Sequence, residues 1–141
     1  MRSYTDIEQS KKLAKILPIE SADMCWTSFD EKWDAYLGAP NPDAIKKEIP
    51  CWSLSALMNI LPSEFTEKGE YSETTYNIHI RKYALTDNID VYQIAYGSYY
   101  WHEDGSCTWS DMVNTGEKEN LIDAAFQMVI WLKENNKLCL I

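Results

Sequence analysis

The sequence predicts an α+β domain, in which an antiparallel sheet is covered on one face by about three helices. Two observations point to the sheet. Residues alternate between apolar and polar from Thr74 to Leu85, and β-forming residues fill the stretch from Val91 to Val113. A third observation is that three other segments carry apolar residues at helical spacing. We expect a three-stranded meander over about residues 75–112, which a short N-terminal strand can extend.

Composition bounds the class of protein. The 141 residues fit a single domain, 1–141, and 45% hydrophobic with 25% charged residues is ordinary for a globular chain. The net charge of −9, from 13 Lys and Arg against 22 Asp and Glu, argues against a nucleic-acid partner. It favours a basic protein partner, although acidity that merely keeps the protein soluble explains the same number.

The sequence also predicts the compartment. No run of residues reaches the apolar length of a membrane span, and the N-terminus is polar. We therefore expect a cytoplasmic protein with no membrane association. Its four cysteines are widely spaced and are expected to be free thiols: Cys25, Cys51, Cys107 and Cys139.

The N-terminal part predicts a helix and then a strand. Thr5-Asp6-Ile7-Glu8 has the form of a capping box, and the helix that it opens is expected to reach Leu17 before Pro18. Met24-Cys25-Trp26 is typical of a short strand. The segment that follows is harder to assign, and Trp33, Tyr36 and Leu37 could line a short helix there.

Two further helices are predicted around the sheet. Ser53 is a good N-cap for an apolar helix that runs to Leu61, and Ser63 to Glu73 is expected to be a polar connection. Asn120 is expected to cap the C-terminal helix, which Asn135-Asn136 ends.

The stretch from Val91 to Val113 predicts a hairpin. Asp104-Gly105 suits a two-residue type I′ turn, which would place His102 opposite Cys107 and Tyr100 opposite Trp109. Alternation would then put these four residues on one face with Ile94 and Tyr96. The other face would carry Ala95, Tyr99, Trp101 and Thr108. Gly97 leaves room for a bulge that would exchange the faces beyond it.

Cysteine and histidine provide the candidates for catalysis. His102 and Cys107, beside Glu103 and Asp104, resemble a nucleophile with its base or part of a metal site. Cys51 lies just before a helix start, where a thiol pKa falls. The alternative for both thiols is structural packing. The sequence has no phosphate-binding loop, G-x-S-x-G or metal-ligand spacing, so we expect no cofactor and no metal.

Aromatic residues provide the candidates for binding. Rigid aromatic side chains on a sheet can stack on sugars or hold a peptide, although most such residues simply cover a core. The candidate surface consists of Tyr92, Tyr96, Tyr99, Tyr100, Trp101 and Trp109.

Three stretches carry a resemblance to a known group. Tyr4 to Ala14, Glu20 to Met24 and Pro50 to Pro62 resemble small uncharacterised proteins of Bacteroides-type gut bacteria and their mobile elements, and 120–138 resembles them more loosely. The resemblance covers about half of the chain. It implies a bacterial cytoplasm and a mobile-element setting, and it supplies no activity and no catalytic residue.

These observations favour a small non-enzymatic module that binds a protein partner, with a homodimer as a further option. One alternative is a thiol-dependent hydrolase that uses a Cys/His pair. Another is a carbohydrate-binding module with an aromatic face.

Overall fold

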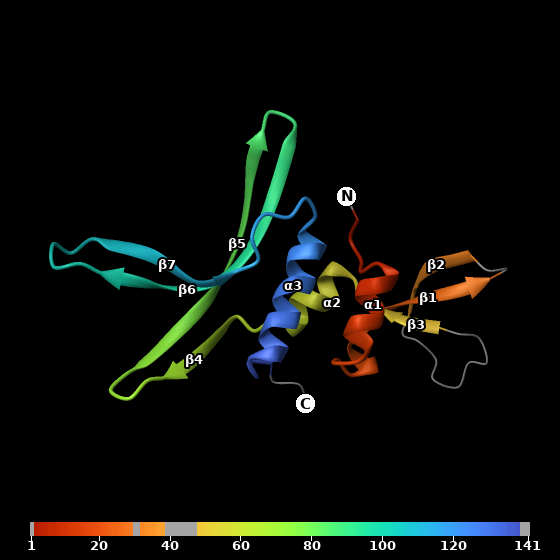
Figure 1. The fold of residues 1–141 in the computed structure, drawn as a ribbon, viewed down its shortest axis with the longest axis horizontal. Coiled ribbons are helices and arrows are strands. Elements are labelled where there is room, and N and C mark those ends of the chain that lie inside the picture. Colours follow the sequence, from red (N-terminus) through yellow and green to blue (C-terminus); the bar gives the residue numbers. More distant parts are fainter. Residues whose placement is uncertain (1, 30–31, 39–47, 139–141) are drawn as a thin grey trace.

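The computed structural model describes residues 2–29, 32–38 and 48–138, and Cys139 lies outside them. The α+β class is confirmed, but the strands form two antiparallel sheets, ordered β2-β1-β3 and β4-β5-β6-β7. The helices lie between the two sheets (Figure 1). The element bounds are α1 Ile7–Ala14, a short 3₁₀ turn Ile19–Ser21, β1 Met24–Phe29, β2 Lys32–Leu37, β3 Glu48–Cys51, α2 Leu54–Ile60, β4 Glu64–Lys68, β5 Glu73–Thr86, β6 Ile89–Trp101, β7 Cys107–Asn114 and α3 Leu121–Glu134.

The first helix begins one residue later than expected. Asp6, not Thr5, is the N-cap of α1, and its side chain accepts a 2.7 Å bond from the backbone N–H of Gln9. The Gln9 side chain accepts from the Asp6 backbone N–H in return, which completes a capping box. The helix ends at Ala14, short of the expected Leu17. Thr5 is unavailable as a cap because its hydroxyl is engaged elsewhere in the buried interior.

The three-stranded sheet contains the expected strand at Met24 and a strand in the segment that was harder to assign. Residues Lys32–Leu37 form β2, which pairs antiparallel with β1, and not the short helix that their spacing suggested. The helical spacing of Trp33, Tyr36 and Leu37 was a weak signal, because a six-residue segment carries less than two helical turns. Pairing with β1 satisfies its backbone groups instead.

The four-stranded sheet contains the predicted meander as β5, β6 and β7. Its fourth strand, β4, lies in the segment that was expected to be a polar connection, and it pairs with β5 from Glu64↔Asn77 to Lys68↔Glu73. Phe65 is the half-buried apolar residue of β4, and its ring packs 5.1 Å from that of Tyr96. One inward aromatic on an otherwise polar strand is enough to attach it to the sheet edge.

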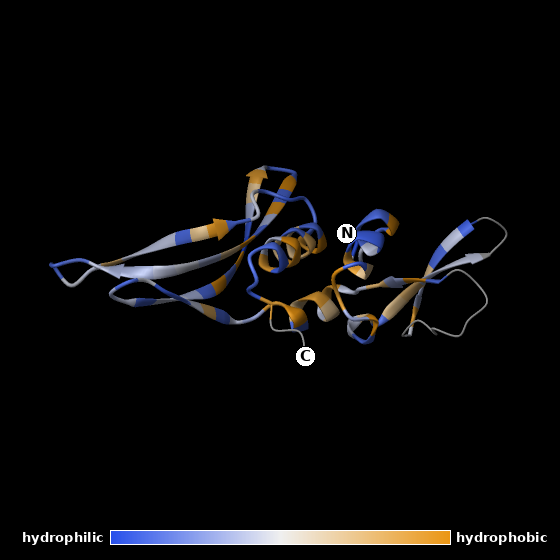
Figure 2. Cartoon of the chain, turned by 60° about the horizontal axis from the view of Figure 1, so that its bottom comes forward, coloured by the Kyte–Doolittle hydropathy of each residue, from blue (hydrophilic) through white to orange (hydrophobic). Residues whose placement is uncertain are grey.

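One apolar cluster joins the helices to the larger sheet. Helix α3 packs on β6, α2 packs on α3, and α1 packs against β3. Apolar residues gather where these elements face one another (Figure 2). The largest fully buried side chains of the cluster are Trp52, Tyr96, Leu13, Leu57, Ile94, Ile122, Met128, Leu132 and Val129. Among the described residues, no helix has the length and apolar character needed to cross a bilayer.

The two other predicted helix starts and ends agree with the structure in position. Ser53 caps α2 by accepting from the backbone N–H of Ala56. Asn120 occupies the N-cap position of α3, although its side chain makes no capping bond. Asn135 is the C-cap, and Asn136 follows with a positive φ of 56°, a conformation that asparagine tolerates better than most residues.

Candidate interaction surface on the four-stranded sheet

The β6–β7 hairpin has a different register from the predicted one. Its loop consists of Glu103, Asp104 and Gly105, with the His102 N–H donating to the Ser106 carbonyl at 2.8 Å. Only Gly105 has a positive φ, 86°, whereas a type I′ turn would require one at Asp104 as well. The third loop residue moves every cross-strand pair by one position. Trp101 therefore lies opposite Cys107, and Tyr99 lies opposite Trp109.

A bulge beside Gly97 exchanges the faces of β7. Tyr96 pairs with Val113 and Gly97 with Asp111, so Met112 is the extra residue. Beyond the bulge, β7 turns Trp109 and Cys107 to the side of Tyr99 and Trp101, away from the helices. The predicted alternation along β6 is correct, but the predicted faces of Cys107, Thr108 and Trp109 were wrong because of the one-residue shift.

The hairpin projects past the helices as an arm, which we call the aromatic arm: residues Ser98–Ser110 of β6, the loop and β7 (Figure 1). Helix α3 does not cover it, so its large side chains remain exposed. Tyr99 is 56%, Tyr100 61% and Trp101 75% exposed. Tyr99 and Trp101 lie on the outer face, and Tyr100 lies on the opposite one.

Ring stacking fixes the base of the arm. The ring of His79, from β5, lies parallel to the indole of Trp109, with centroids 3.5 Å apart and planes 4° apart. Tyr99 meets the same indole edge-on at 5.1 Å. Aromatic contacts of this kind hold the rings in one arrangement before any ligand arrives. The rings therefore have little conformational entropy left to lose on binding.

An ion pair continues this surface across the sheet. Arg81 of β5 reaches over β6 to Asp111 of β7 and makes two hydrogen bonds with its carboxylate, one of them 2.9 Å long. The indole N–H of Trp109 donates to the same carboxylate at 2.6 Å. The hydrogen bonding from Arg81 has the largest effect, and together these bonds lower the pKa of Asp111 to about 2. Ala95 lies on β6 between Arg81 and Asp111, and its small side chain leaves room for the Arg81 side chain to cross β6.

The hydrogen-bond network on this face ends at Glu117. The side-chain oxygen of Gln93 accepts a 3.4 Å bond from Arg81, and the side-chain NH₂ of Gln93 donates to the Tyr83 hydroxyl at 3.2 Å. Tyr83 donates in turn to Glu117 at 2.6 Å, and this bond raises the pKa of Tyr83. Each polar group named here is satisfied by a neighbour. The hydrogen-bond network therefore acts chiefly to hold three strands and the rings of the outer face in place.

Two of the six candidate aromatic residues lie away from this surface. Tyr96 is fully buried in the core, where its hydroxyl donates to the Pro62 carbonyl at 2.6 Å and burial raises its pKa. Tyr92 is half-buried on the helix side of the sheet, with the Lys82 ammonium 5.7 Å from its ring. The exposed or half-exposed members are Tyr99, Tyr100, Trp101 and Trp109.

The histidine and cysteine of the arm are both exposed but do not face one another across the strands. His102 shares a 2.7 Å hydrogen bond with the Thr108 hydroxyl, and Cys107 lies opposite Trp101. The predicted cross-strand pair of His102 and Cys107 depended on the two-residue turn, and it is lost with that turn. Among the described residues, no group of three or more His, Cys, Asp and Glu side chains is arranged to hold a metal ion.

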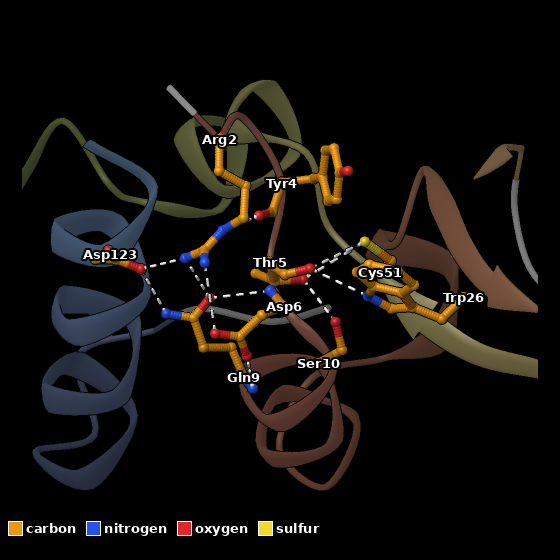
Figure 3. Close-up of polar contacts among 9 residues, drawn as sticks. All are labelled: Arg2, Tyr4, Thr5, Asp6, Gln9, Ser10, Trp26, Cys51 and Asp123. Carbon is orange, nitrogen blue, oxygen red and sulfur yellow. Dashed lines mark hydrogen bonds and ion pairs between the residues drawn. The ribbon is translucent and has the colours of Figure 1, made fainter. Parts of the chain in front are cut away.

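Cys51 lies in a buried polar junction instead of at an open helix start (Figure 3). It is the last residue of β3, is fully buried, and its sulfur lies 3.6 Å from the Thr5 hydroxyl and 3.5 Å from the Thr5 carbonyl. Burial raises the pKa of its thiol, and the hydrogen bonds only partly oppose this effect. A thiol in this setting is protonated at neutral pH, which agrees with structural packing and not with the reactive thiolate that a helix start could create.

The sequence partly signalled the residues that it missed. The alternation of β5 placed His79, Arg81 and Tyr83 on one face, but nothing in it distinguished a polar outer face from a binding surface. Asp111 could not be assigned because the bulge at Met112 changes which face it occupies.

Comparison with protein-family models, with curated proteins and with solved structures found no match for this chain.

Proposed function

We propose that the protein is a non-enzymatic interaction module that binds a basic protein partner through the aromatic arm. The observation that carries this proposal is the exposure of Tyr99, Tyr100 and Trp101 on a projecting hairpin whose base is held by the His79–Trp109 stack. Large exposed aromatic groups on a rigid support are typical of the residues that dominate binding energy in protein interfaces.

Charge supports the class of partner. The chain carries −9, and the loop at the tip of the arm contributes Glu103 and Asp104 beside the exposed rings. Lys and Arg side chains of a partner can contact both, because a cation is attracted to acidic groups and to the faces of Tyr and Trp rings. A bacterial cytoplasm and a mobile-element setting belong to the same proposal, on the resemblance of the N-terminal half.

The test combines affinity capture with two arm variants. The full chain, immobilised, is exposed to a bacterial lysate, and each captured protein is then purified and titrated against the wild type and the variants Tyr99→Ala and Trp101→Ala. We expect a basic partner whose affinity falls at least about tenfold with either change. Tyr71→Ala is the matched control, because Tyr71 is 92% exposed but lies in the β4–β5 turn.

Two results would overturn this function. One is a set of partners that binds both arm variants as well as it binds the wild type. The other is a glycan array in which the wild type binds a sugar and Trp101→Ala does not, which would establish carbohydrate binding in its place. The observation that favours this second candidate is the flat exposed ring of Trp101 near Tyr99 on one face.

A further inference from the structure

Strand β7 forms an outer edge of the four-stranded sheet. The strand order is β4-β5-β6-β7, so β6 pairs with one side of β7 and no described strand lies along the other (Figure 1). Residues Cys107 to Asp111 pair with β6 without interruption, because the bulge comes only after them, at Met112. We call their open side the β7 edge: residues 107–111, all but the last of which belong to the aromatic arm.

The direction of the backbone groups along this edge follows from one hydrogen bond beside the loop. The Ser106 carbonyl accepts from the His102 N–H, so the backbone groups of Ser106 point toward β6. Backbone groups alternate in direction along a strand, so those of Cys107, Trp109 and Asp111 point away from β6. Within the part of the chain that the structure describes, no strand or loop pairs with these three N–H and three C=O groups.

This edge lacks the usual protections of an open strand. Natural edges are protected by prolines, by lysines or by bulges. Residues 107–111 contain no proline and no lysine, and the bulge lies beyond them. Their one charged residue, Asp111, directs its carboxylate back over the sheet to Arg81. The backbone groups of the β7 edge are therefore open to an added strand.

The local charges at the β7 edge favour a basic occupant. None of its five residues is a cation. The aromatic arm as a whole carries Glu103 and Asp104 at its tip and contains no Lys or Arg. The guanidinium of Arg81 belongs to β5, two strands away, and it is bonded to the Asp111 carboxylate. A Lys or Arg of an added strand would therefore lie opposite acidic or uncharged residues.

We propose that the basic partner binds the β7 edge through an extended segment that pairs as an added strand, a binding mode that rests on the function proposed above. Cys107 is small and lies directly opposite Trp101, which is 75% exposed. A Lys or Arg opposite Cys107 reaches over the cysteine to the Trp101 ring, whose face attracts a cation. Arg81 makes a crossing of the same kind over Ala95 of β6.

The same charges count against a second copy as the occupant. The aromatic arm of another chain would bring no Lys or Arg to Glu103 and Asp104, because it contains none. Pairing of two arms would instead bring two acidic tips into one assembly. A basic segment supplies the opposite charge that the tip lacks, so it is the better complement.

The test uses a synthetic peptide of about eight alternating arginine and threonine residues, which is the length of an ordinary strand. Its arginines would share the face of Trp101, and its threonines would lie opposite Thr108 and Ser110. Two N-methylated forms carry methyl groups on all arginines or on all threonines. Because the N–H groups of one set face one edge of an extended peptide, one form should lose binding and the other should keep it. Equal affinities for the two forms would overturn strand addition.

Protein variants locate the site. Cys107→Pro removes an N–H that points away from β6, at the first residue of an edge strand, where proline is tolerated. We expect it to weaken peptide binding about tenfold. Cys107→Ala is the matched control: it keeps the N–H and a small side chain, and it should bind like the wild type. Circular dichroism checks that both variants fold, and equal binding by the two folded variants would contradict pairing at this edge.

Hydrogen exchange of the wild type gives a measurement that needs no variant. Peptide addition should slow exchange at the amides of Cys107, Trp109 and Asp111. Protection confined to Tyr99 and Trp101, whose N–H groups point to the other edge of the arm, would overturn the proposal. So would sedimentation of the free chain as a dimer with the first three amides already protected, which would make a second copy the occupant.

Two variants separate this binding mode from the proposed function itself. If Trp101→Ala weakens the binding of a basic partner and Cys107→Pro does not, the aromatic arm binds that partner without strand addition. Only the added strand is then overturned. If neither change weakens the binding, the proposed function is overturned together with it.

Discussion

Gly97 determines how closely β7 can approach β6 at the base of the aromatic arm. A Cβ atom at this position would lie 2.2 Å from the Ser110 carbonyl oxygen and 2.8 Å from the indole of Trp109. The oxygen belongs to the backbone and cannot move aside without disturbing the strand pair. The absence of a side chain therefore permits both the bulge and the stack of Trp109 on His79.

At the residue scale, we expect Gly97→Ala to lower the free energy of unfolding by roughly 2–3 kcal/mol, the cost of forcing atoms into filled space. Chemical denaturation measures this change, and the near-ultraviolet circular dichroism of Trp109 should change with it. Ser98→Ala, at the next position of β6, is the control and should cost far less. A Gly97→Ala protein as stable as the wild type would contradict the close approach.

At the scale of elements, the Arg81–Asp111 pair joins β5 to β7 across β6. The pKa of Asp111 is lowered from 3.8 to about 2, so its carboxylate stabilises the folded state at any pH above about 4. That contribution is lost as the pH falls from 3.8 toward 2, because the carboxylate then takes up a proton more readily in the unfolded chain.

We therefore expect Asp111→Asn to be less stable than the wild type at neutral pH and to lose less stability between pH 4 and pH 2. Urea denaturation across this range measures both effects. Asp34→Asn removes an exposed carboxylate of β2 and serves as the control. If Asp111→Asn and the wild type fell in parallel over the window, the ion pair would contribute nothing to acid stability.

At the scale of the whole molecule, the N-terminal segment ties the helices together. Arg2 pairs with Asp123 of α3, which also accepts from the Gln9 amide of α1 at 2.7 Å (Figure 3). These contacts link residues 114 or more positions apart in the chain. They fix α1, and with it β3, against the helix that packs on the larger sheet.

A double-mutant cycle tests this link. Arg2→Ala and Asp123→Ala should show a coupling of about 1 kcal/mol, the upper range for partly exposed pairs, and salt should reduce it. The control cycle uses the Lys68–Glu73 pair, whose side chains are 82% and 62% exposed. A coupling no larger than that of the control would show that the N-terminal segment is not held by this pair.

The sequence by itself determined the α+β class, the strands of the meander and the ends of the C-terminal helix. These features depend on local periodicity and on residues that suit turns and caps, so neighbours along the chain are enough to specify them. The acidic charge and the exposed aromatic candidates on the hairpin were visible for the same reason.

Tertiary structure decided the rest. Whether Asp104-Gly105 forms a two-residue or a three-residue loop depends on the pairing of β6 with β7, and a shift of one residue exchanges the cross-strand partners of His102, Cys107 and Trp109. The capping residue of α1 moved to Asp6 because buried partners engage Thr5. Strand β5 has no described neighbour on its outer side beyond Ile78 because β4 is short, and a strand's own sequence does not record where its neighbour ends.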